Sequence, residues 1–277
     1  MKLNNFLTRT LTGTVYVTLI VASILIHPLF FYIVFAGFAI AGLIEFYNIT
    51  NSDKIKPHFF TGLFITVVMF VFSANSAFNA ISLEYLLILV PLSFSVFIFE
   101  LFRNKQNPLQ NIATTLLGLF YIALPLSLLV FIPNISLENG VFKKGLLLGF
   151  FILIWTNDTF AYLIGVKFGK NKLFERVSPK KSWEGSFGGF LFSIIVAYIL
   201  SLFFIDLNTM EWIGMAIIIV VFGSIGDLIE SLFKRSLNIK DSGNILPGHG
   251  GILDRLDAVL IAAPFVFFYL LLINFLI

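Results

Sequence analysis

Asp227, Ser231 and Lys234 are the first residues whose types and spacing suggest chemistry. They stand at positions i, i+4 and i+7 of an apolar stretch, so a helix places them on one face. An Asp costs about 2.5–3.5 kcal/mol at the centre of a membrane helix, and it usually faces a bundle interior or a water-filled cavity. The stretch therefore predicts a functional site at a helix end. The simpler interpretation is an ion pair of Asp227 with Lys234 or Arg235 at the membrane edge.

A glycine-rich loop, residues 247–251, follows this helix. Three glycines within four residues let the backbone approach a ligand closely and adopt positive φ, and successive N–H groups in such a turn bind anions. The loop opens the last predicted helix, whose N-terminus carries partial positive charge. The loop therefore predicts phosphate binding by Gly248, Gly250 and Gly251, although such loops are more often only tight connections.

Carboxylates and basic side chains surround this loop. Asp254 and Asp257 lie one turn apart at the start of the last helix, where the helix dipole alone would account for one of them. With Asp227 and Asp241 they suit a divalent cation, because Mg²⁺ takes one or two carboxylates and the substrate phosphates. Basic groups would neutralise the remaining phosphate charge. The basic residues and histidine of this set are Lys234, Arg235, Lys240, Arg255 and His249.

A second polar block precedes these residues. Asp158, Tyr162 and Gly165 share one face of a predicted helix, and Asp158 is ionisable within a spanning run. Lys180 and Lys181 lie in a basic turn before the next helix. Their functional interpretation is contact with a triphosphate or a lipid phosphate, and the alternative is anchoring of a cytoplasmic loop.

The composition identifies the elements that must position these residues as membrane helices. Of 277 residues, 58% are hydrophobic and only 12% charged, with mean hydropathy +0.98; this excludes a soluble or a disordered chain. The absence of Cys excludes disulfides and thiolate chemistry. Runs of about 20 apolar residues predict an all-α polytopic membrane protein with nine spanning helices, at 10–26, 28–47, 59–74, 84–102, 111–132, 144–165, 185–205, 210–232 and 254–276.

The distribution of Lys and Arg predicts the orientation. With the N-terminus in the cytoplasm, nine helices leave 16 of the 18 basic residues on the cytoplasmic side, and only Lys143 and Lys144 outside. The C-terminus is then outside, and both polar blocks face the cytoplasm. The N-terminal sequence, which lacks a transit-peptide pattern, favours a bacterial cytoplasmic membrane.

The two blocks together resemble the CDP-diacylglycerol synthase (phosphatidate cytidylyltransferase) family. The resemblance covers about residues 155–257, and earlier in the chain only Glu45-Phe46-Tyr47 suggests it. The second block contributes residues 158–165, 168–170 and 178–185. The C-terminal signature spans 27 residues without a departure, as Ser231, Lys234-Arg235, Lys240-Asp241, Pro247-Gly248-His249-Gly250-Gly251, Asp254-Arg255 and Asp257.

The resemblance implies transfer of CMP from CTP to phosphatidate, forming CDP-diacylglycerol and pyrophosphate. On this hypothesis Asp227 and Asp254 hold the metal. Asp241 and Asp257 either support the metal ligands without touching the metal or form salt bridges, and Ser231 helps metal or phosphate binding. His249 contacts a phosphate, assists departure of pyrophosphate or is structural. The remaining contacts to substrate fall to Lys234, Arg235, Arg255, Lys240, Asp158, Lys180, Lys181 and the 248–251 backbone.

The resemblance also implies partners and organisation. We expect Mg²⁺, with two ions favoured and an assisting monovalent cation left open, together with CTP, membrane phosphatidate and no nucleic acid. A homodimer in the cell membrane is expected. Residues 1–105 would form a scaffold, a dimer surface or a lipid entry, and residues 106–277 the catalytic region.

Four alternatives follow from the residues alone. A CTP-dependent lipid-alcohol kinase would release CDP instead of pyrophosphate, and a relative acting on an ether lipid would transfer CMP in the same way to a lipid with different tails. A CDP-alcohol phosphatidyltransferase is disfavoured because residues 254–257 do not continue into its aspartate pattern. A transporter of anionic metabolites is disfavoured because the chain shows no repeat and its polar groups gather on one side.

Overall fold

The computed structural model describes residues 2–79, 87–135, 142–243, 245, 248 and 250–276, and within these it leaves out the side chains of 2–7, 76–79 and 276. The chain forms two compact units, each discontinuous in sequence. Unit 1 comprises Met1–Gly140 and Asp241–Arg255, and unit 2 comprises Val141–Lys240 and Leu256–Ile277. The first boundary between these units lies near residue 140, because the helical segments after Pro108 pack with those of residues 28–103. The predicted division into residues 1–105 and 106–277 is one of functional role and stays a prediction.

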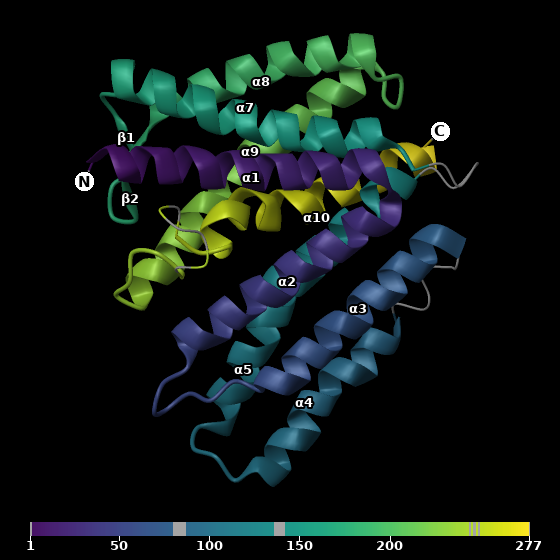
Figure 1. Cartoon of the computed structure of the whole chain (residues 1–277), viewed down its shortest axis with the longest axis vertical. Helices are drawn as coiled ribbons and strands as arrows, with labels where there is room; N and C mark the ends of the chain where they lie inside the picture. Colours follow the sequence, from purple (N-terminus) through teal and green to yellow (C-terminus); the bar gives the residue numbers. More distant parts are fainter. Residues whose placement is uncertain are drawn as a thin grey trace. The chain divides into compact units, whose positions relative to one another are not determined.

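The structure is almost wholly helical (Figure 1). The helical elements before residue 140 are α1 (Lys2–Ile26), α2 (Pro28–Thr50), α3 (Phe59–Asn79), α4 (Leu89–Arg103), α5 (Pro108–Gly118), η2 (Leu119–Ala123), α6 (Leu124–Leu129) and η3 (Ile132–Asn134). The elements after it are α7 (Lys144–Phe168), β1 (Lys172–Phe174), β2 (Ser178–Ser182), α8 (Trp183–Phe203), α9 (Thr209–Ser236) and α10 (Leu253–Leu276).

The predicted fold class is confirmed: this is an all-α polytopic membrane protein. Helix covers most of the described part of each of the nine predicted ranges. Among the described residues, seven helical stretches are long and apolar enough to cross a membrane, and the apolar stretch of α3 is shorter. Nine spans and the sides of the two termini therefore stay predictions.

The predicted break at His27-Pro28 is confirmed. Helix α1 ends at Ile26, His27 is extended at φ −157° and ψ 140°, and Pro28 opens α2. Proline suits the first position of a helix, where its missing N–H would have no intrahelical partner. The Nδ1 atom of His27 accepts a hydrogen bond from the backbone N–H of Leu29 at 3.1 Å and so caps α2.

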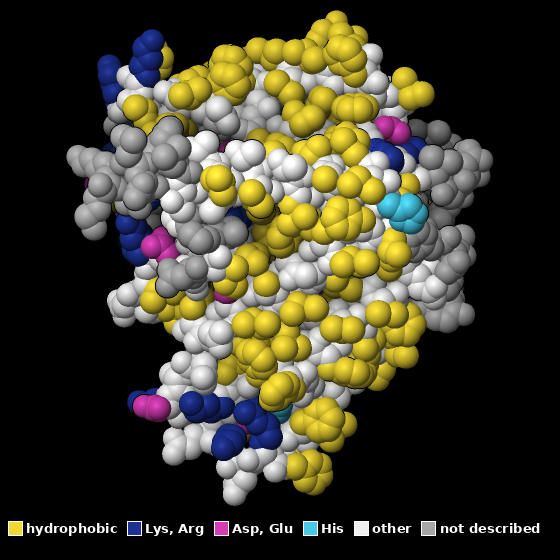
Figure 2. All heavy atoms as spheres, viewed as in Figure 1, with side chains coloured by type: hydrophobic (Ala, Val, Ile, Leu, Met, Phe, Trp, Pro, Cys, Tyr) yellow, Lys and Arg dark blue, Asp and Glu magenta, His cyan; other side chains and the backbone are white. Residues whose placement is uncertain are grey.

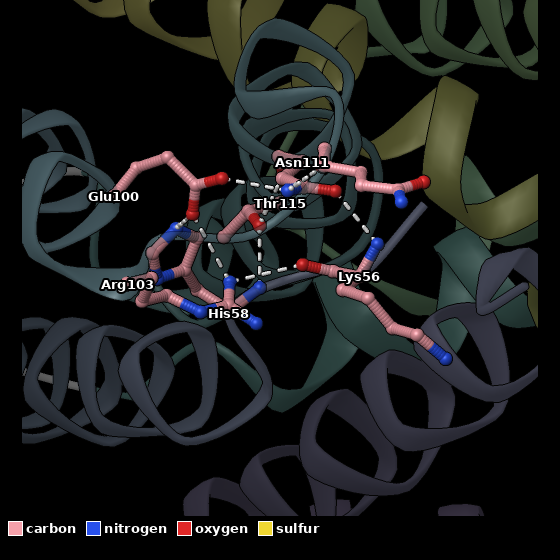
Figure 3. Close-up of polar contacts among 7 residues, drawn as sticks. Lys56, His58, Glu100, Arg103, Asn111 and Thr115 are labelled. Atoms are coloured by element: carbon pink, nitrogen blue, oxygen red, sulfur yellow. Dashed lines mark hydrogen bonds and ion pairs between the residues drawn. The ribbon is translucent and has the colours of Figure 1, made fainter. Parts of the chain in front are cut away.

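Unit 1 contains a buried polar network at one end of α3, α4 and α5 (Figure 3). Glu100 lies 2.6 Å from Nε2 of His58 and 3.2 Å from Arg103. Its other oxygen accepts from Nδ2 of Asn111 at 2.6 Å, and Thr115 accepts from the backbone N–H of His58 at 2.8 Å. Because the partners come from the residue before α3, from α4 and from α5, the network ties these three helix ends together.

The surface of this end of unit 1 is basic, whereas the helix flanks are apolar (Figure 2). Lys54 and Lys56 belong to the α2–α3 connection, Arg103 ends α4 and Lys105 follows it in the α4–α5 connection. Nδ2 of Asn107 joins the two connections through the carbonyl of Lys54. Large apolar side chains next to them are exposed, among them Phe60, Leu101, Phe102 and Leu109. A basic rim beside exposed apolar side chains is the pattern of a membrane interface.

Unit 2 is built on α7, α8 and α9, of which α7 and α8 run side by side (Figure 1). An antiparallel hairpin of β1 and β2 joins α7 to α8, with Lys172 opposite Ser182 and an irregular register beside it. The sequence did not predict these strands; it predicted only a basic turn. The hairpin places the lysines of this turn over the end of α7.

Candidate functional site

A polar cavity of about 570 Å³ lies within unit 2. Helix α7 lines it with Asp158 and Tyr162, the hairpin contributes three lysines, and α9 contributes Asp227. The lysines are Lys172, Lys180 and Lys181. The structure thus brings together four of the predicted site residues from three separate elements. A cavity with three lysines and two carboxylates suits a polyphosphate with a bound cation.

The first turn of α8 holds the hairpin in place over this cavity. Ser182 caps α8 by accepting from the backbone N–H of Gly185 at 3.2 Å. Glu184 accepts from the backbone N–H groups of Lys170 and Asn171 at 3.1–3.2 Å. Its carboxylate therefore ties the start of the hairpin to the helix that follows it.

Helix α8 packs closely against Asn157 and Ala161 of α7, which line the cavity. A Cβ atom at Gly185 would lie 2.6 Å from the carbonyl oxygen of Ala161, and one at Gly189 would lie 2.4 Å from Oδ1 of Asn157. Both distances are shorter than real Cβ contacts, so these positions require glycine. Small residues at these two positions bring the backbones of α7 and α8 together.

Asp227 pairs with Lys181 across the cavity. This is not the pairing that the simpler sequence interpretation expected, because Lys234 instead lies 2.6 Å from Glu230 on its own helix. Asp257 of α10 lies within hydrogen-bonding reach of Asp227, with Glu230 nearby. Unit 2 therefore concentrates three acidic side chains around the end of α9 that lines the cavity.

The arrangement of these acids fits a hard divalent cation in part. Oxygen ligands are what Mg²⁺ prefers, and it usually keeps positions for water and phosphate. Among the described residues, no group of three or more His, Asp or Glu side chains is arranged to close around one ion. Asp227 and Asp257 supply a pair, and a nucleotide-bound Mg²⁺ typically takes one or two carboxylates.

In unit 1, Asp254 organises segment 241–252, which contains the glycine-rich loop. Its Oδ2 atom accepts from the backbone N–H groups of Ser242 at 2.9 Å and Gly251 at 2.8 Å. Glu45 of α2 accepts from the N–H groups of Ile252 and Leu253. The donors at the start of α10 therefore bind carboxylates, and the expected phosphate cradle is reduced to the turn around Gly248 and Gly250, which have φ of +78° and +86°.

The other predicted site residues are distributed over both units. Asp241 and Arg255 belong to unit 1 and are exposed, as is Gly248. The carbonyl of Arg255 accepts from the hydroxyl of Tyr16 at 3.1 Å. His249 lies outside the described residues. In unit 2, Ser231 and Lys234 are half-buried in α9, whereas Arg235 and Lys240 are exposed.

The structure adds three residues that the sequence interpretation did not place in the site. Lys172 lines the cavity in unit 2. In unit 1, Cγ of Arg9 is the atom nearest to a Cβ built at Gly248, at 3.1 Å, and the side chain of Glu45 is buried beside the loop. Glu45 carries the same signal that identified Asp227, an acid in an apolar helix. Nothing in the sequence distinguishes Arg9 from a basic membrane anchor.

Comparison with known proteins gives a consistent result. A family model described as the cytidylyltransferase family matches residues 7–273. The phosphatidate cytidylyltransferase of Staphylococcus aureus (strain COL) is 33% identical over 262 residues, which cover 92% of this chain and 95% of that protein. The enzymes of the same name from Staphylococcus haemolyticus and Staphylococcus epidermidis are 33% and 34% identical, each over 80% of this chain and 84% of their own length.

Proposed function

The chain belongs to the cytidylyltransferase family, and from that premise we propose that it transfers CMP from CTP to phosphatidate, forming CDP-diacylglycerol and pyrophosphate. The observation that carries the proposal is the cavity of unit 2. It holds the positive charge that a triphosphate requires, next to Asp158 and Asp227. A membrane protein with such a cavity can receive a water-soluble nucleotide and a lipid phosphate at the same surface.

The chain does not need a nucleophile of its own for this reaction. The lipid phosphate is already largely ionised near pH 7, because a second phosphate pKa is about 6. One of its oxygens forms a bond to the α-phosphorus of CTP. The bond from that phosphorus to the bridging oxygen of the β-phosphate breaks, and pyrophosphate leaves with the electron pair. The protein then has to align two anions and offset their repulsion.

Each basic residue of the cavity has a task in this proposal. Lys172 and Lys180 bind triphosphate oxygens, and Lys181 does so while keeping Asp227 in place. Outside the cavity, Lys234 and Arg235 of unit 2 and Arg255 of unit 1 stay the phosphate contacts expected from the sequence. Arg9 is a further candidate within unit 1, because it lies beside Gly248. A lysine acts as a movable point charge, which suits a phosphate group that changes its charge and position during transfer.

We further propose Mg²⁺ as the cofactor, as one or two ions. Asp227 and Asp257 would hold it in unit 2, and Asp254 stays a candidate ligand from the sequence. When bound, Mg²⁺ offsets negative charge on the phosphates and on the leaving pyrophosphate. The pairing with Lys181 keeps the Asp227 carboxylate in place for this.

The proposal places the enzyme in the cell membrane as a homodimer with its site at the cytoplasmic face. The excess of Lys and Arg in alternate loops supports this orientation, and CTP is supplied from the cytoplasm. The dimer rests on the family resemblance.

The decisive experiment measures pyrophosphate release by purified protein in mixed micelles containing CTP, Mg²⁺ and phosphatidate. Release should require all three, and Asp227→Asn should lower turnover by about 100-fold or more, as removal of one charge-stabilising group does. Asp53→Asn, an exposed aspartate in the α2–α3 connection, is the matched control and should retain full activity.

Product analysis distinguishes this activity from those of other CTP-using enzymes. The lipid product should carry the cytidine label, with one pyrophosphate for each CTP consumed. Release of CDP with a phosphorylated lipid alcohol would overturn the proposal in favour of a kinase. Full activity in Asp227→Asn would overturn the assignment of the cation to this residue.

A further inference from the structure

Glu45 is a buried acid that the proposed reaction does not use. It lies in α2 and is 4% exposed, yet its partners come from more than 200 residues further along the chain. Its two carboxylate oxygens accept from the backbone N–H groups of Ile252 at 2.9 Å and Leu253 at 3.1 Å. The contact lies entirely within unit 1.

These contacts make Glu45 the cap of α10. The first N–H groups of a helix have no intrahelical acceptor, and a carboxylate there also interacts favourably with the helix dipole. A cap normally comes from the residue just before the helix. Here a different helix supplies it, so the start of α10 is attached to α2.

Asp254 and Glu45 together hold the backbone on both sides of Gly248 and Gly250. Asp254 accepts from the N–H groups of Ser242, before these two glycines, and Gly251, after them. The hydroxyl of Ser242 lies 3.0 Å from Asp254 and 3.3 Å from Glu45. Because a hydroxyl has a single proton, it donates to one carboxylate at a time. The Ser242 hydroxyl can therefore alternate between Asp254 and Glu45.

Two glycines allow Glu45 to come this close. A Cβ atom at Gly251 would lie 2.4 Å from Oε2 of Glu45, and one at Gly243 would lie 2.6 Å from Oε1. Both glycines flank the turn that carries Gly248 and Gly250. The backbone of the segment is therefore shaped around the Glu45 carboxylate at two separate points.

On the basis of the proposed function, we propose that Glu45 is a positioning residue for catalysis: its carboxylate sets the position of the glycine-rich turn that binds the CTP phosphates. Glu45 does not contact the nucleotide. It holds the N–H groups at the start of α10 and so determines where Gly248, which lies beside Arg9, and Gly250 are placed.

The test compares Glu45→Gln with Glu100→Gln. Glutamine keeps the size of the side chain but replaces one acceptor oxygen with an NH₂ group, which cannot accept from the helix N–H groups. Glu100 is an equally suitable buried glutamate of unit 1, 5% exposed and bound to His58 and Arg103, and it makes no hydrogen bond to the described residues of segment 241–252. Its replacement reports the cost of losing a buried carboxylate elsewhere in the unit.

The first readout compares the change in the KM for CTP with the change in the KM for phosphatidate. Glu45→Gln should raise the KM for CTP by about tenfold, with the KM for phosphatidate unchanged, since a small misplacement of a binding group has effects of this size. Glu100→Gln should lower the active fraction, and with it kcat, and leave both KM values unchanged. An unchanged KM for CTP in Glu45→Gln would overturn the proposal.

The second readout does not depend on turnover. Amide hydrogen exchange at Ser242, Gly251, Ile252 and Leu253 should become faster in Glu45→Gln and not in Glu100→Gln. If the wild type proves inactive with CTP and phosphatidate, the proposed function fails, whereas exchange still tests the cap. Faster exchange with an unchanged KM would show a purely structural cap and would also overturn the positioning role.

A second variant covers the case in which Glu45→Gln does not fold. Ser242→Ala removes only the hydroxyl between the two carboxylates and should raise the KM for CTP in the same direction by a smaller factor. Wild-type values of both the KM and the exchange rates in Ser242→Ala would then count against the positioning role.

Discussion

Lys181 of unit 2 both lines the cavity proposed to bind the triphosphate and pairs with Asp227, the proposed cation ligand. Its ammonium pairs with Asp227, while 28% of its side chain remains exposed. Pairs this exposed contribute only about 0–1 kcal/mol to stability. The value of Lys181 therefore lies in binding phosphate and in holding Asp227 in place, and not in folding.

Replacement of Lys181 should separate these two effects. We expect Lys181→Met to lower kcat/KM for CTP by at least about tenfold, comparable to losing one charged contact, with a nearly unchanged melting temperature. Lys167→Met is the control, because Lys167 lies over the ring of Phe168 outside the lining of the cavity. Equal losses in the two variants would refute the assignment of Lys181.

His58 makes the stability of unit 1 depend on pH. Burial and the neighbouring Arg103 lower the pKa of His58 below its usual value, against the opposing effect of Glu100. The unfolded chain then binds more protons than the folded one just below pH 6.5, so the free energy of unfolding falls as the pH decreases through this range. Melting temperatures measured between pH 7.5 and 5.5 should fall in the wild type and less steeply in His58→Gln. Parallel curves for the two proteins would contradict this assignment.

Part of the site could be predicted residue by residue, and part could not. Asp158, Lys180, Lys181 and Asp227 were selected from residue type and spacing, and they line one cavity. Their mutual positions were not predictable, since the pairing of Lys181 with Asp227 joins elements 46 residues apart. Glu45 carried the same signal as Asp227, but its partners lie 207 residues away and leave no local pattern.

At the scale of elements, the contact of α7 with α8 determines the shape of the cavity. We expect Gly185→Ala to lower the free energy of unfolding by about 1–3 kcal/mol, as overpacking does, because its Cβ would meet the backbone of Ala161. Gly37→Ala in α2 has nothing within 4 Å of its Cβ and should stabilise by up to about 1 kcal/mol through helix propensity. Thermal unfolding in detergent measures both. An unchanged free energy of unfolding in Gly185→Ala would show that α7 and α8 can move apart without loss of stability.

The helices were predictable and the hairpin was not, for a physical reason. A spanning helix leaves a run of about 20 apolar residues in any sequence, and the break at Pro28 follows from the chemistry of proline. The strands of the hairpin have three and five residues, are mostly polar and show no apolar alternation. Their pairing depends on Glu184 and Ser182 at the start of α8, which is tertiary context.

A π-helical turn between α5 and α6 also had no sequence signal of its own. It spans Leu119–Ala123 and precedes Pro125. The ring of a proline clashes with the carbonyl four residues before it, and proline lacks the N–H that would bond there. A local widening of the helix accommodates both effects, and such single π turns are common at constrained positions.

At the scale of the whole molecule, the orientation in the membrane is open to direct measurement. The chain has no native cysteine, so single cysteines introduced at exposed positions report sidedness without background. Lys105→Cys should react with an impermeant maleimide from the cytoplasmic side, and Met210→Cys at the start of α9 from the outside. Labelling of both from one side would refute the predicted topology.

The division into two units was not accessible from the sequence. Segments 1–105 and 106–277 were expected from the limits of the recognisable motifs, and the functional roles given to them stay predictions. The structural units depend on packing between segments far apart in the chain. Hydropathy reports the length of each helix but not its neighbours, because lipid-facing and protein-facing helices are both apolar.

The discontinuity of unit 1 has a consequence for biosynthesis. Glu45 leaves the ribosome with the second helix, but Ile252 and Leu253 are translated only after some 200 further residues. During that interval the carboxylate has to remain hydrated or be held by the insertion machinery, since burying it alone would be costly. A nascent chain released before residue 241 would keep every residue of the cavity in unit 2. It would lack Ile252 and Leu253, whose N–H groups bind Glu45 in unit 1. Quality-control proteases should therefore recognise such truncated chains by their N-terminal half.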